Sequence, residues 1–170
     1  MMNNLKQNKF TPWVLLVVRV YVGWIWLYAG YEKIINPKWV GSDAGMAVTG
    51  FLKGALAKTS GDHPDVQAWY AWLITHVALP NAALFSYLVS FGELLVGLAL
   101  ILGAFTMLAA GAGLFMNFNY LLAGAVSINP ILIILQLLLV WGGEQSSKIG
   151  LDRYLKKYFP SKSDENKNTV

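Results

Sequence analysis

Four apolar stretches, separated by polar or glycine-containing connections, dominate the chain. They cover residues 13–35, 82–103, 106–127 and 130–143. A helix rises about 1.5 Å per residue, so the first three can cross a hydrocarbon core of about 30 Å. The fourth is shorter, but Asn129 can cap it and Pro130 suits a first helical turn. The pattern predicts an all-α integral membrane protein built as a four-helix bundle.

The connections predict how these helices pack. Residues 103–105 and 126–129 form very tight turns, and short connections force antiparallel neighbours. The long loop at 36–81 contains two segments with apolar residues at helical spacing, 48–56 and 66–77. We expect two short amphipathic helices there, the first capped by Ser42 or Asp43, on the outer membrane surface or over the bundle.

Composition supports a membrane protein of one domain. The 170 residues are 56% apolar and 13% charged, with a mean hydropathy of +0.48, whereas soluble domains are about 45–50% apolar and roughly a quarter charged. This balance excludes a disordered chain and argues against a soluble enzyme. The chain has no cysteine, which excludes disulfides, thiolate metal sites, iron–sulfur clusters and a persulfide relay within it. We expect a transmembrane domain over residues 1–159 and a disordered polar tail over 160–170.

Basic residues predict the orientation in the membrane. The two tails carry eight of them, whereas the 36–81 loop has three lysines balanced by three aspartates. The positive-inside rule therefore places both termini in the cytoplasm and the long loop outside. The first stretch is too long and aromatic-rich for a cleaved signal peptide, so we expect it to be retained as a span. Two termini on one side need an even number of spans, which predicts a multi-pass protein of the cell membrane.

Two charged side chains, Arg19 and Glu93, fall deep inside the apolar stretches, away from their ends. Charged groups at membrane depth are costly and often mark function. Counted from the cytoplasmic ends of their stretches, Arg19 lies roughly 9 Å deep and Glu93 roughly 15 Å deep, a gap that an extended arginine can bridge. We expect them to face each other, either as a buried ion pair that only locks two helices or as part of a polar pocket. Such a pocket could bind an anion, a quinone headgroup or a proton.

Uncharged polar residues at similar depth extend this predicted pocket. Asn117 and Tyr120 share one helical face with Gly113, so we expect Asn117, rather than Asn119, to point into the bundle. Gln136 lies at a similar level in the fourth stretch. Asn117, Tyr120 and Gln136 are therefore the expected cofactor-binding residues. Interhelical hydrogen bonding, worth about 0.6 kcal/mol on average in membranes, is their simpler role.

Several cofactor chemistries are excluded. The only histidines, His63 and His76, fall in the outer loop, so a transmembrane bis-histidine haem cannot form. The chain has no nucleotide-binding loop of the Walker or dinucleotide type, and one Glu–Arg pair has too few ligands for a structural metal site. Any redox chemistry here needs a bound quinone or a partner's cofactor.

Five short motifs follow one another along the chain: Arg19-x3-Gly23, Tyr28-Ala29-Gly30-Tyr31-x-Lys33, Gly92-Glu93-x3-Gly97-x-Ala99-Leu100-x2-Gly103, Trp141-Gly142-Gly143 and Gly150-Leu151-Asp152-Arg153. In this order they resemble the DoxX/DoxD family of small four-helix membrane proteins, over about residues 12–158. The outer loop with Trp69 and the Pro80-Asn81-Ala82 segment are similar to the DoxD-like branch. The resemblance implies a membrane component of thiosulfate:quinone oxidoreductase, which oxidises thiosulfate to tetrathionate and passes electrons to the membrane quinone. It also implies a separate partner subunit, of DoxA or sulfurtransferase type.

Two functions follow as hypotheses, and neither involves nucleic acid. As an oxidoreductase subunit, the protein would draw an anionic sulfur substrate to Lys33 and Lys38 at its outer face and bind quinone between its helices. Glu93 would exchange the quinone's proton, and Arg19 would orient Glu93 or stabilise negative charge on the reduced quinone. As a non-enzymatic scaffold or lipid-binding bundle, the protein would use Arg19 and Glu93 structurally. Its outer helices or basic tail would then recruit redox or sulfurtransferase partners.

Overall fold

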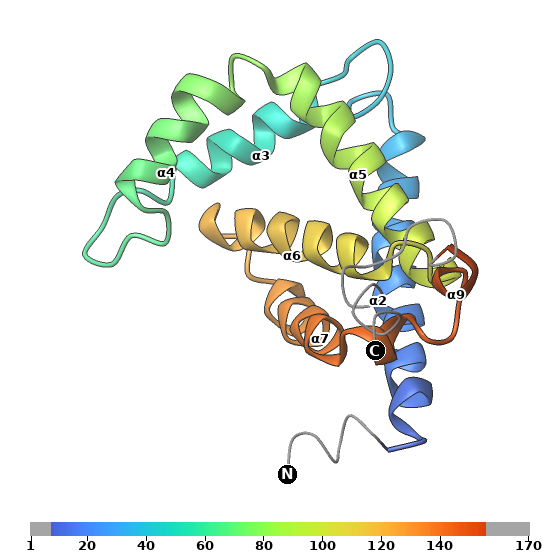
Figure 1. The fold of residues 1–170 in the computed structure, drawn as a ribbon. Coiled ribbons are helices and arrows are strands. Elements are labelled where there is room, and N and C mark those ends of the chain that lie inside the picture. The colour runs from blue at the N-terminus through green and yellow to red at the C-terminus, as the bar shows by residue number, and fades with distance from the viewer. Residues whose placement is uncertain (1–7, 156–170) are drawn as a thin grey trace, which may run out of the picture.

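The computed structural model describes residues 8–155, and its regular elements in that range are all helices (Figure 1). The four predicted stretches form α2 (Thr11–Ile34), α5 (Ala82–Leu102), α6 (Thr106–Leu122) and α7 (Asn129–Gly142). The long loop holds α3 (Met46–Leu56), α4 (Ala68–Leu73) and the π-helix η1 (Ile74–Ala78). After α7 come α8 (Glu144–Ser147) and α9 (Asp152–Leu155). The predicted all-α class is confirmed over the described range.

Helices α2 and α5 pack antiparallel along a seam of glycines. A Cβ atom on Gly30 would overlap the backbone of Leu94, and one on Gly97 would overlap the backbone of Leu27. A Cβ on Gly23 would lie 3.0 Å from the backbone oxygen of Gly97. Small residues of this kind let helices approach closely where no hydrophobic force acts between them. The seam fixes how far the two helices are shifted along each other.

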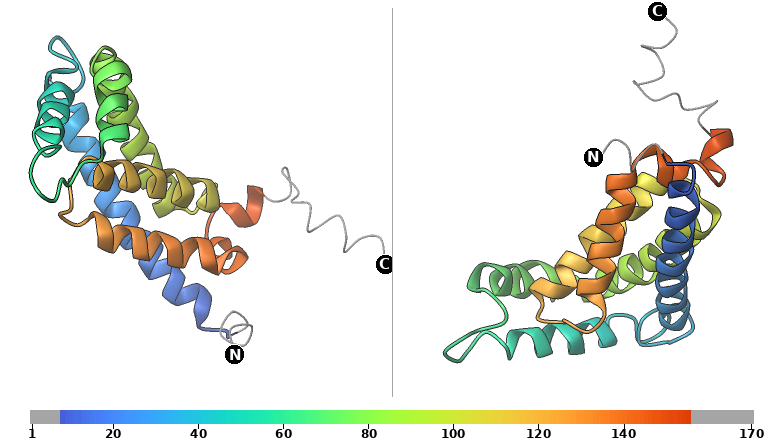
Figure 2. Two further views of the ribbon diagram at one scale, coloured as in Figure 1. Left: turned by 90° about the vertical axis from the view of Figure 1, so that its left-hand side faces the viewer. Right: turned by 90° about the horizontal axis from the view of Figure 1, so that it is seen from below.

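Helices α6 and α7 lie side by side and cross α2 (Figure 2). Helix α6 also contacts α5, and α7 contacts α2, so the four long helices enclose one apolar core. Its buried members are Leu15, Val22, Trp26, Val96, Leu100, Ala109, Ala110, Leu132 and Leu139. This core surrounds the polar side chains described below.

A second apolar core lies beneath the long loop, at the end of the molecule where α2 finishes and α5 begins (Figure 1). Its buried members lie on α3, α4 and η1, just before α4 and just after α6: Val48, Leu52, Ala55, Val66, Tyr70, Ile74, Ala78 and Ala123. The Tyr70 hydroxyl donates to the backbone oxygen of Asn119 at 3.0 Å and to its Oδ1 at 3.1 Å. Burial raises the pKa of Tyr70, which keeps this hydroxyl protonated as a donor.

The starts of two helices differ from the sequence prediction. Helix α3 begins after Gly45 rather than after a Ser42 or Asp43 cap, and its N-cap makes no side-chain hydrogen bond. Gly45 has φ +96°, and a Cβ there would lie 2.8 Å from the backbone nitrogen of Ala83. Asn129 is the first residue of α7 rather than its cap, and its side-chain Nδ2 donates to the Ala125 oxygen at 2.8 Å. The start of α3 is therefore decided by close packing against the backbone of Ala83. The local sequence does not reveal this contact.

The third apolar stretch also ends earlier than expected, because the chain leaves the helix at Leu122 instead of continuing to residue 127. The Ala125 N–H bonds back to the Tyr120 oxygen at 2.9 Å, and Gly124 takes φ +69°. The Lys58 ammonium donates to the Gly124 oxygen at 2.6 Å. A cation placed at a helix C-terminus in this way also interacts favourably with the helix dipole.

Helices α2 and α5 are each long and apolar enough to cross a membrane, judged by length and composition. Helices α6 and α7 are shorter, at 17 and 14 residues. Large apolar side chains on the outside of all four are between 61% and 72% exposed: Val17, Leu95, Leu108, Phe115 and Ile134. Soluble monomers rarely expose apolar surface so widely, so this outer surface is suited to lipid.

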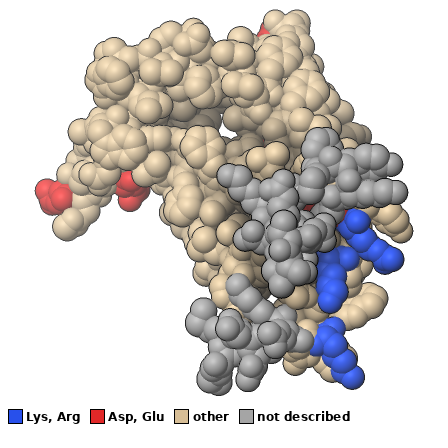
Figure 3. Space-filling model, in the orientation of Figure 1, with Lys and Arg blue, Asp and Glu red and all other residues tan. Residues whose placement is uncertain are grey.

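On the face seen in Figure 3, the visible basic and acidic side chains lie at different places. Lysine and arginine side chains gather at the end that carries α9 and the start of α2, and acidic side chains are visible near the loop between α3 and α4. Helix α9 lies near the end of the predicted domain of residues 1–159. Residues 156–159 of that domain and the predicted polar tail at 160–170 lie outside the described residues.

Candidate functional site

The glycine seam places Lys33, in the last turn of α2, against Glu93 in the middle of α5. The Lys33 Nζ lies 2.5 Å from Glu93 Oε2 and donates more weakly to the Ala29 oxygen at 3.4 Å. The Glu93 side chain is 2% exposed and that of Lys33 is 20% exposed. A buried carboxylate needs such a partner, because desolvation penalises an isolated charge heavily.

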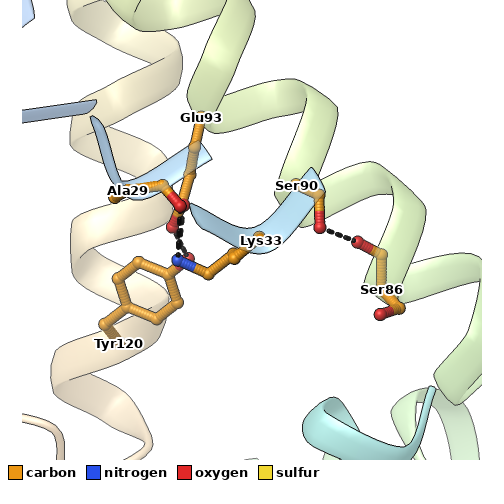
Figure 4. A network of polar contacts seen from close by, with 6 residues as sticks. All are labelled: Ala29, Lys33, Ser86, Ser90, Glu93 and Tyr120. Carbon is orange, nitrogen blue, oxygen red and sulfur yellow. Dashed lines mark hydrogen bonds and ion pairs between the residues drawn. The ribbon is translucent and has the colours of Figure 1, made fainter. Parts of the chain in front are cut away.

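A third helix completes the coordination of Glu93. The Tyr120 hydroxyl, from α6, donates to Glu93 Oε1 at 2.5 Å (Figure 4). Each carboxylate oxygen therefore has its own partner, one a cation and one a phenol. The Tyr120 ring stacks on Trp26, with centroids 6.4 Å apart, and meets the edge of Phe51 at 6.1 Å. These ring contacts hold the phenol in place.

Lys33 connects this buried group to the surface of the protein. A pocket of about 670 Å³ lies beside it, lined by Ala29, Glu32, Lys33, Ile35, Asn36, Pro37 and Trp39. The Lys33 ammonium lies 5.1 Å from the centroid of the Trp39 ring, within cation–π range. Lys38, predicted together with Lys33 to bind substrate, is exposed and is not among the lining residues.

The predicted cofactor-binding residues divide between two polar groups. Tyr120 belongs to the Glu93 group, whereas Asn117 and Gln136 bond to each other, with Asn117 Nδ2 donating to Gln136 Oε1 at 2.5 Å. Both of these amides are fully buried. In the opposite orientation of the Gln136 amide, its nitrogen faces Asn117 instead and its oxygen accepts from the Trp26 indole at 2.9 Å. Trp26 therefore lies between the two groups, in contact with both.

The prediction that Arg19 faces Glu93 is wrong. The Arg19 guanidinium donates to the backbone oxygens of Ser146 at 2.8 Å and Ile149 at 2.5 Å. It lies about four helical turns from Lys33, roughly 21 Å along the helix axis. The prediction counted depth from the ends of the two apolar stretches, as though these ends were level. The glycine seam instead shifts α2, so that Arg19 meets Gly103 at the end of α5.

Arg19 belongs to a structural joint that sequence reasoning missed. Asp152 accepts the Phe105 N–H at 2.5 Å and the Thr106 N–H at 2.9 Å, which caps the start of α6. The Asp152 N–H in turn donates to the Gly103 oxygen at 2.7 Å. Asp152 also attracts the Arg19 charge electrostatically. The Gly150-Leu151-Asp152-Arg153 motif was the sequence feature that pointed to this joint. The local sequence does not indicate which residues Asp152 contacts.

The signal for the Lys33–Glu93 pair was present in α2. Arg19, Gly23, Gly30 and Lys33 fall on one stripe of a helix, and the first three of these are buried. Lys33, one turn after Gly30, was therefore the cation best placed to meet a buried acid on α5. Within residues 8–155, no group of three or more metal-ligating His, Cys, Asp or Glu side chains comes together.

The DoxX family model matches residues 14–124, which include Lys33, Glu93 and Tyr120. The chain belongs to the DoxX family. No curated protein and no solved structure matches it. Together with the two long apolar helices, membership of DoxX indicates a membrane protein, in a family often linked to quinone oxidoreductases. Helix α7 with Gln136, and the Asp152 joint, lie beyond the matched residues.

Proposed function

We propose that this DoxX protein is the membrane component of a quinone-linked oxidoreductase of the thiosulfate:quinone type. It would take part in oxidising thiosulfate to tetrathionate and pass the electrons to the membrane quinone, together with a DoxA-type or sulfurtransferase subunit. The observation that carries this proposal is the buried Glu93 carboxylate, held by Lys33 and Tyr120 beside a pocket that opens outward.

The residues present fit a quinone headgroup. A quinone presents two carbonyl acceptors on an apolar ring, and the pocket offers the Lys33 ammonium as a donor and Ile35, Pro37 and Trp39 as apolar walls. When bound, a quinone accepts two electrons and two protons. Lys33 would orient a carbonyl and offset negative charge, a form of electrostatic stabilisation.

Glu93 would hold and release a proton close to that headgroup. General acid–base catalysis needs a carboxyl within hydrogen-bond reach, directly or through a neighbour, and Lys33 touches both Glu93 and the pocket. Tyr120 would keep the carboxylate oriented, since its ring is fixed by Trp26 and Phe51. Arg19, at the far end of α2, has no part in this step.

The proposal includes the multi-pass topology. Helices α6 and α7 would cross the membrane with α2 and α5, which the apolar side chains on their outer faces support. Both termini would then lie in the cytoplasm, the start of α2 and α9, at the basic end of Figure 3, would face it, and the pocket beside Lys33 would open outside. An anionic sulfur substrate would reach Lys33 from that side.

The test is quinone reduction by proteoliposomes that contain the full chain, with thiosulfate as donor and ubiquinone or menaquinone as acceptor. A DoxA-type or sulfurtransferase subunit is added or omitted. Glu93→Gln should lower turnover about 100-fold or more, since general acid–base groups contribute at least that factor. Lys53→Gln, at an exposed lysine of α3, is the matched control and should turn over normally.

Wild-type turnover by Glu93→Gln would overturn the proton role of Glu93. No turnover in any combination, with a soluble redox partner recovered on the purified chain, would favour the non-enzymatic scaffold instead.

A further inference from the structure

We propose that the pocket beside Lys33 binds a small oxyanion, and that this binding is coupled to uptake of one proton by Glu93. The inference rests on the proposed function, because it concerns the same site. It adds that anion and proton enter together.

The Lys33 ammonium contacts both Glu93 and the outer pocket. Its Nζ is 2.5 Å from Glu93 Oε2, yet the side chain is 20% exposed and lines the outer pocket. An ammonium has three donors, and here one goes to Glu93 and another to the Ala29 oxygen at 3.4 Å. Among the described residues that line the pocket, Lys33 is the one cation. An anion in the pocket and the Glu93 carboxylate therefore compete for the same charge.

Because Glu93 is buried, its charge must be compensated when Lys33 binds an anion. With 2% of its side chain exposed, Glu93 cannot exchange its counter-charge for water. Once Lys33 turns to an anion, the carboxylate either keeps an uncompensated charge in an apolar core or takes up a proton. Desolvation favours the neutral acid, and the Tyr120 hydroxyl remains as a hydrogen-bond partner for it. One proton from the outer solution is thus bound to a Glu93 oxygen for each anion bound.

The groups that face Glu93 from the other elements leave this competition intact. Helix α6 contributes the Tyr120 phenol, and α4 contributes the Tyr70 phenol behind it, which interacts electrostatically with Tyr120. On α5 itself, the Ser90 hydroxyl one turn away donates to the Ser86 oxygen at 2.8 Å (Figure 4). Lys33 is the cation in contact with Glu93.

Glu32, in the pocket wall, opposes an anion and sets a second expectation. Its carboxylate interacts electrostatically with the Tyr28 hydroxyl and lines the pocket with Lys33. Removing the charge of Glu32 should strengthen anion binding. The number of protons taken up per anion should stay the same, because Glu32 is exposed and water solvates its carboxylate with or without the anion.

The experiment is isothermal titration calorimetry of the full chain in nanodiscs, with thiosulfate as the probe and sulfate as a second oxyanion. Measurements in MOPS and in imidazole, whose ionisation enthalpies differ, give the number of protons taken up per anion. The wild type should take up close to one proton, and its affinity should fall by up to about tenfold per pH unit as pH rises, by linkage.

Variants separate the steps. Glu93→Gln should bind thiosulfate at least as tightly as the wild type, with no proton uptake and no pH dependence. Lys33→Gln should lose binding tenfold or more, Lys33→Arg should retain it, and Glu32→Gln should bind more tightly with the same proton count. Lys53→Gln is the matched surface control and should match the wild type.

Thiosulfate binding without proton uptake in the wild type, or proton uptake that persists in Glu93→Gln, would overturn the coupling. Absence of binding in correctly folded wild type would overturn the pocket itself. Neither result depends on quinone turnover. Proton-coupled binding in a chain that reduces no quinone would therefore sustain this inference while the proposed function fails.

Discussion

Gly30 and Gly97 determine which side chain meets Glu93. Neither position has room for a Cβ, because each lies directly on the backbone of the opposite helix. This contact sets the shift between α2 and α5, and the shift brings Lys33, rather than Arg19, to the buried carboxylate. The contact between Lys33 and the buried Glu93 therefore depends on residues that have no side chain of their own.

Gly97→Ala should separate α2 from α5 and destabilise the protein by about 1–3 kcal/mol, the usual cost of overpacking a tight contact. It should also weaken the Lys33–Glu93 pair, because the helices on either side of it move apart. The measurement is thermal unfolding in detergent, followed by circular dichroism.

Gly111→Ala is the control for that substitution, since no atom lies within 4 Å of a Cβ added there. Alanine is more favourable than glycine inside a helix, so the free energy of unfolding of Gly111→Ala should be unchanged or higher by up to about 1 kcal/mol. Equal stability of the two variants would contradict the glycine seam.

The residue-level errors of sequence reasoning share one cause. The sequence identified Arg19, Glu93, Asn117 and Gln136 as polar groups that need partners, and all four are buried. It could not identify the partners, because these depend on the relative shift of helices far apart in the chain. The inward position of Asn117 required only the geometry of one helix, and the structure agrees with it.

At the scale of elements, the segment after α7 joins three helices. Asp152 caps the start of α6, the Leu151 N–H donates to the Leu102 oxygen at 3.1 Å, and Arg19 holds the carbonyls of Ser146 and Ile149. Phe105, at the N-cap of α6, takes φ +50°, so the α5–α6 turn needs this outside support.

Asp152→Ala should destabilise the protein by about 1–2 kcal/mol, as expected for loss of a helix cap. Asp152→Asn keeps a capping oxygen but removes the charge that faces Arg19, so it should fall between alanine and the wild type. Denaturant unfolding in mixed micelles measures all three.

Asp62→Ala, in the exposed loop between α3 and α4, is the control and should change stability by less than about 0.5 kcal/mol. An Asp152→Ala variant as stable as this control would show that the segment after α7 does not support the α5–α6 turn.

Elements were easier to predict than contacts. The continuous apolar stretches located α2, α5 and α7 to within about two residues, and helices occur in both parts of the long loop where helical spacing predicted them. The misjudged ends lie at Gly45 and Gly124, where positive φ and close packing decide the backbone. These ends depend on tertiary contacts that a local pattern does not contain.

For the whole molecule, charge and apolar surface point the same way. Basic side chains gather at the end with α9 and the start of α2, and the loop between α3 and α4 at the other end carries acidic ones (Figure 3). Exposed apolar side chains on α6 and α7 match those on α2 and α5. A membrane that encloses all four helices would leave each charged end in water.

The absence of native cysteine makes this topology directly measurable. Ser60→Cys, in the loop between α3 and α4, should react with a membrane-impermeant maleimide added to intact cells. Lys148→Cys, after α8, should react only after the membrane is permeabilised, because both positions are exposed on the protein and the bilayer alone separates them.

If α6 and α7 did not cross, α2 and α5 would still return the chain to the cytoplasmic side. A third variant, Val126→Cys, in the exposed turn between α6 and α7, therefore decides the number of spans. Labelling of Val126→Cys in intact cells indicates four spans, and labelling only after permeabilisation indicates two.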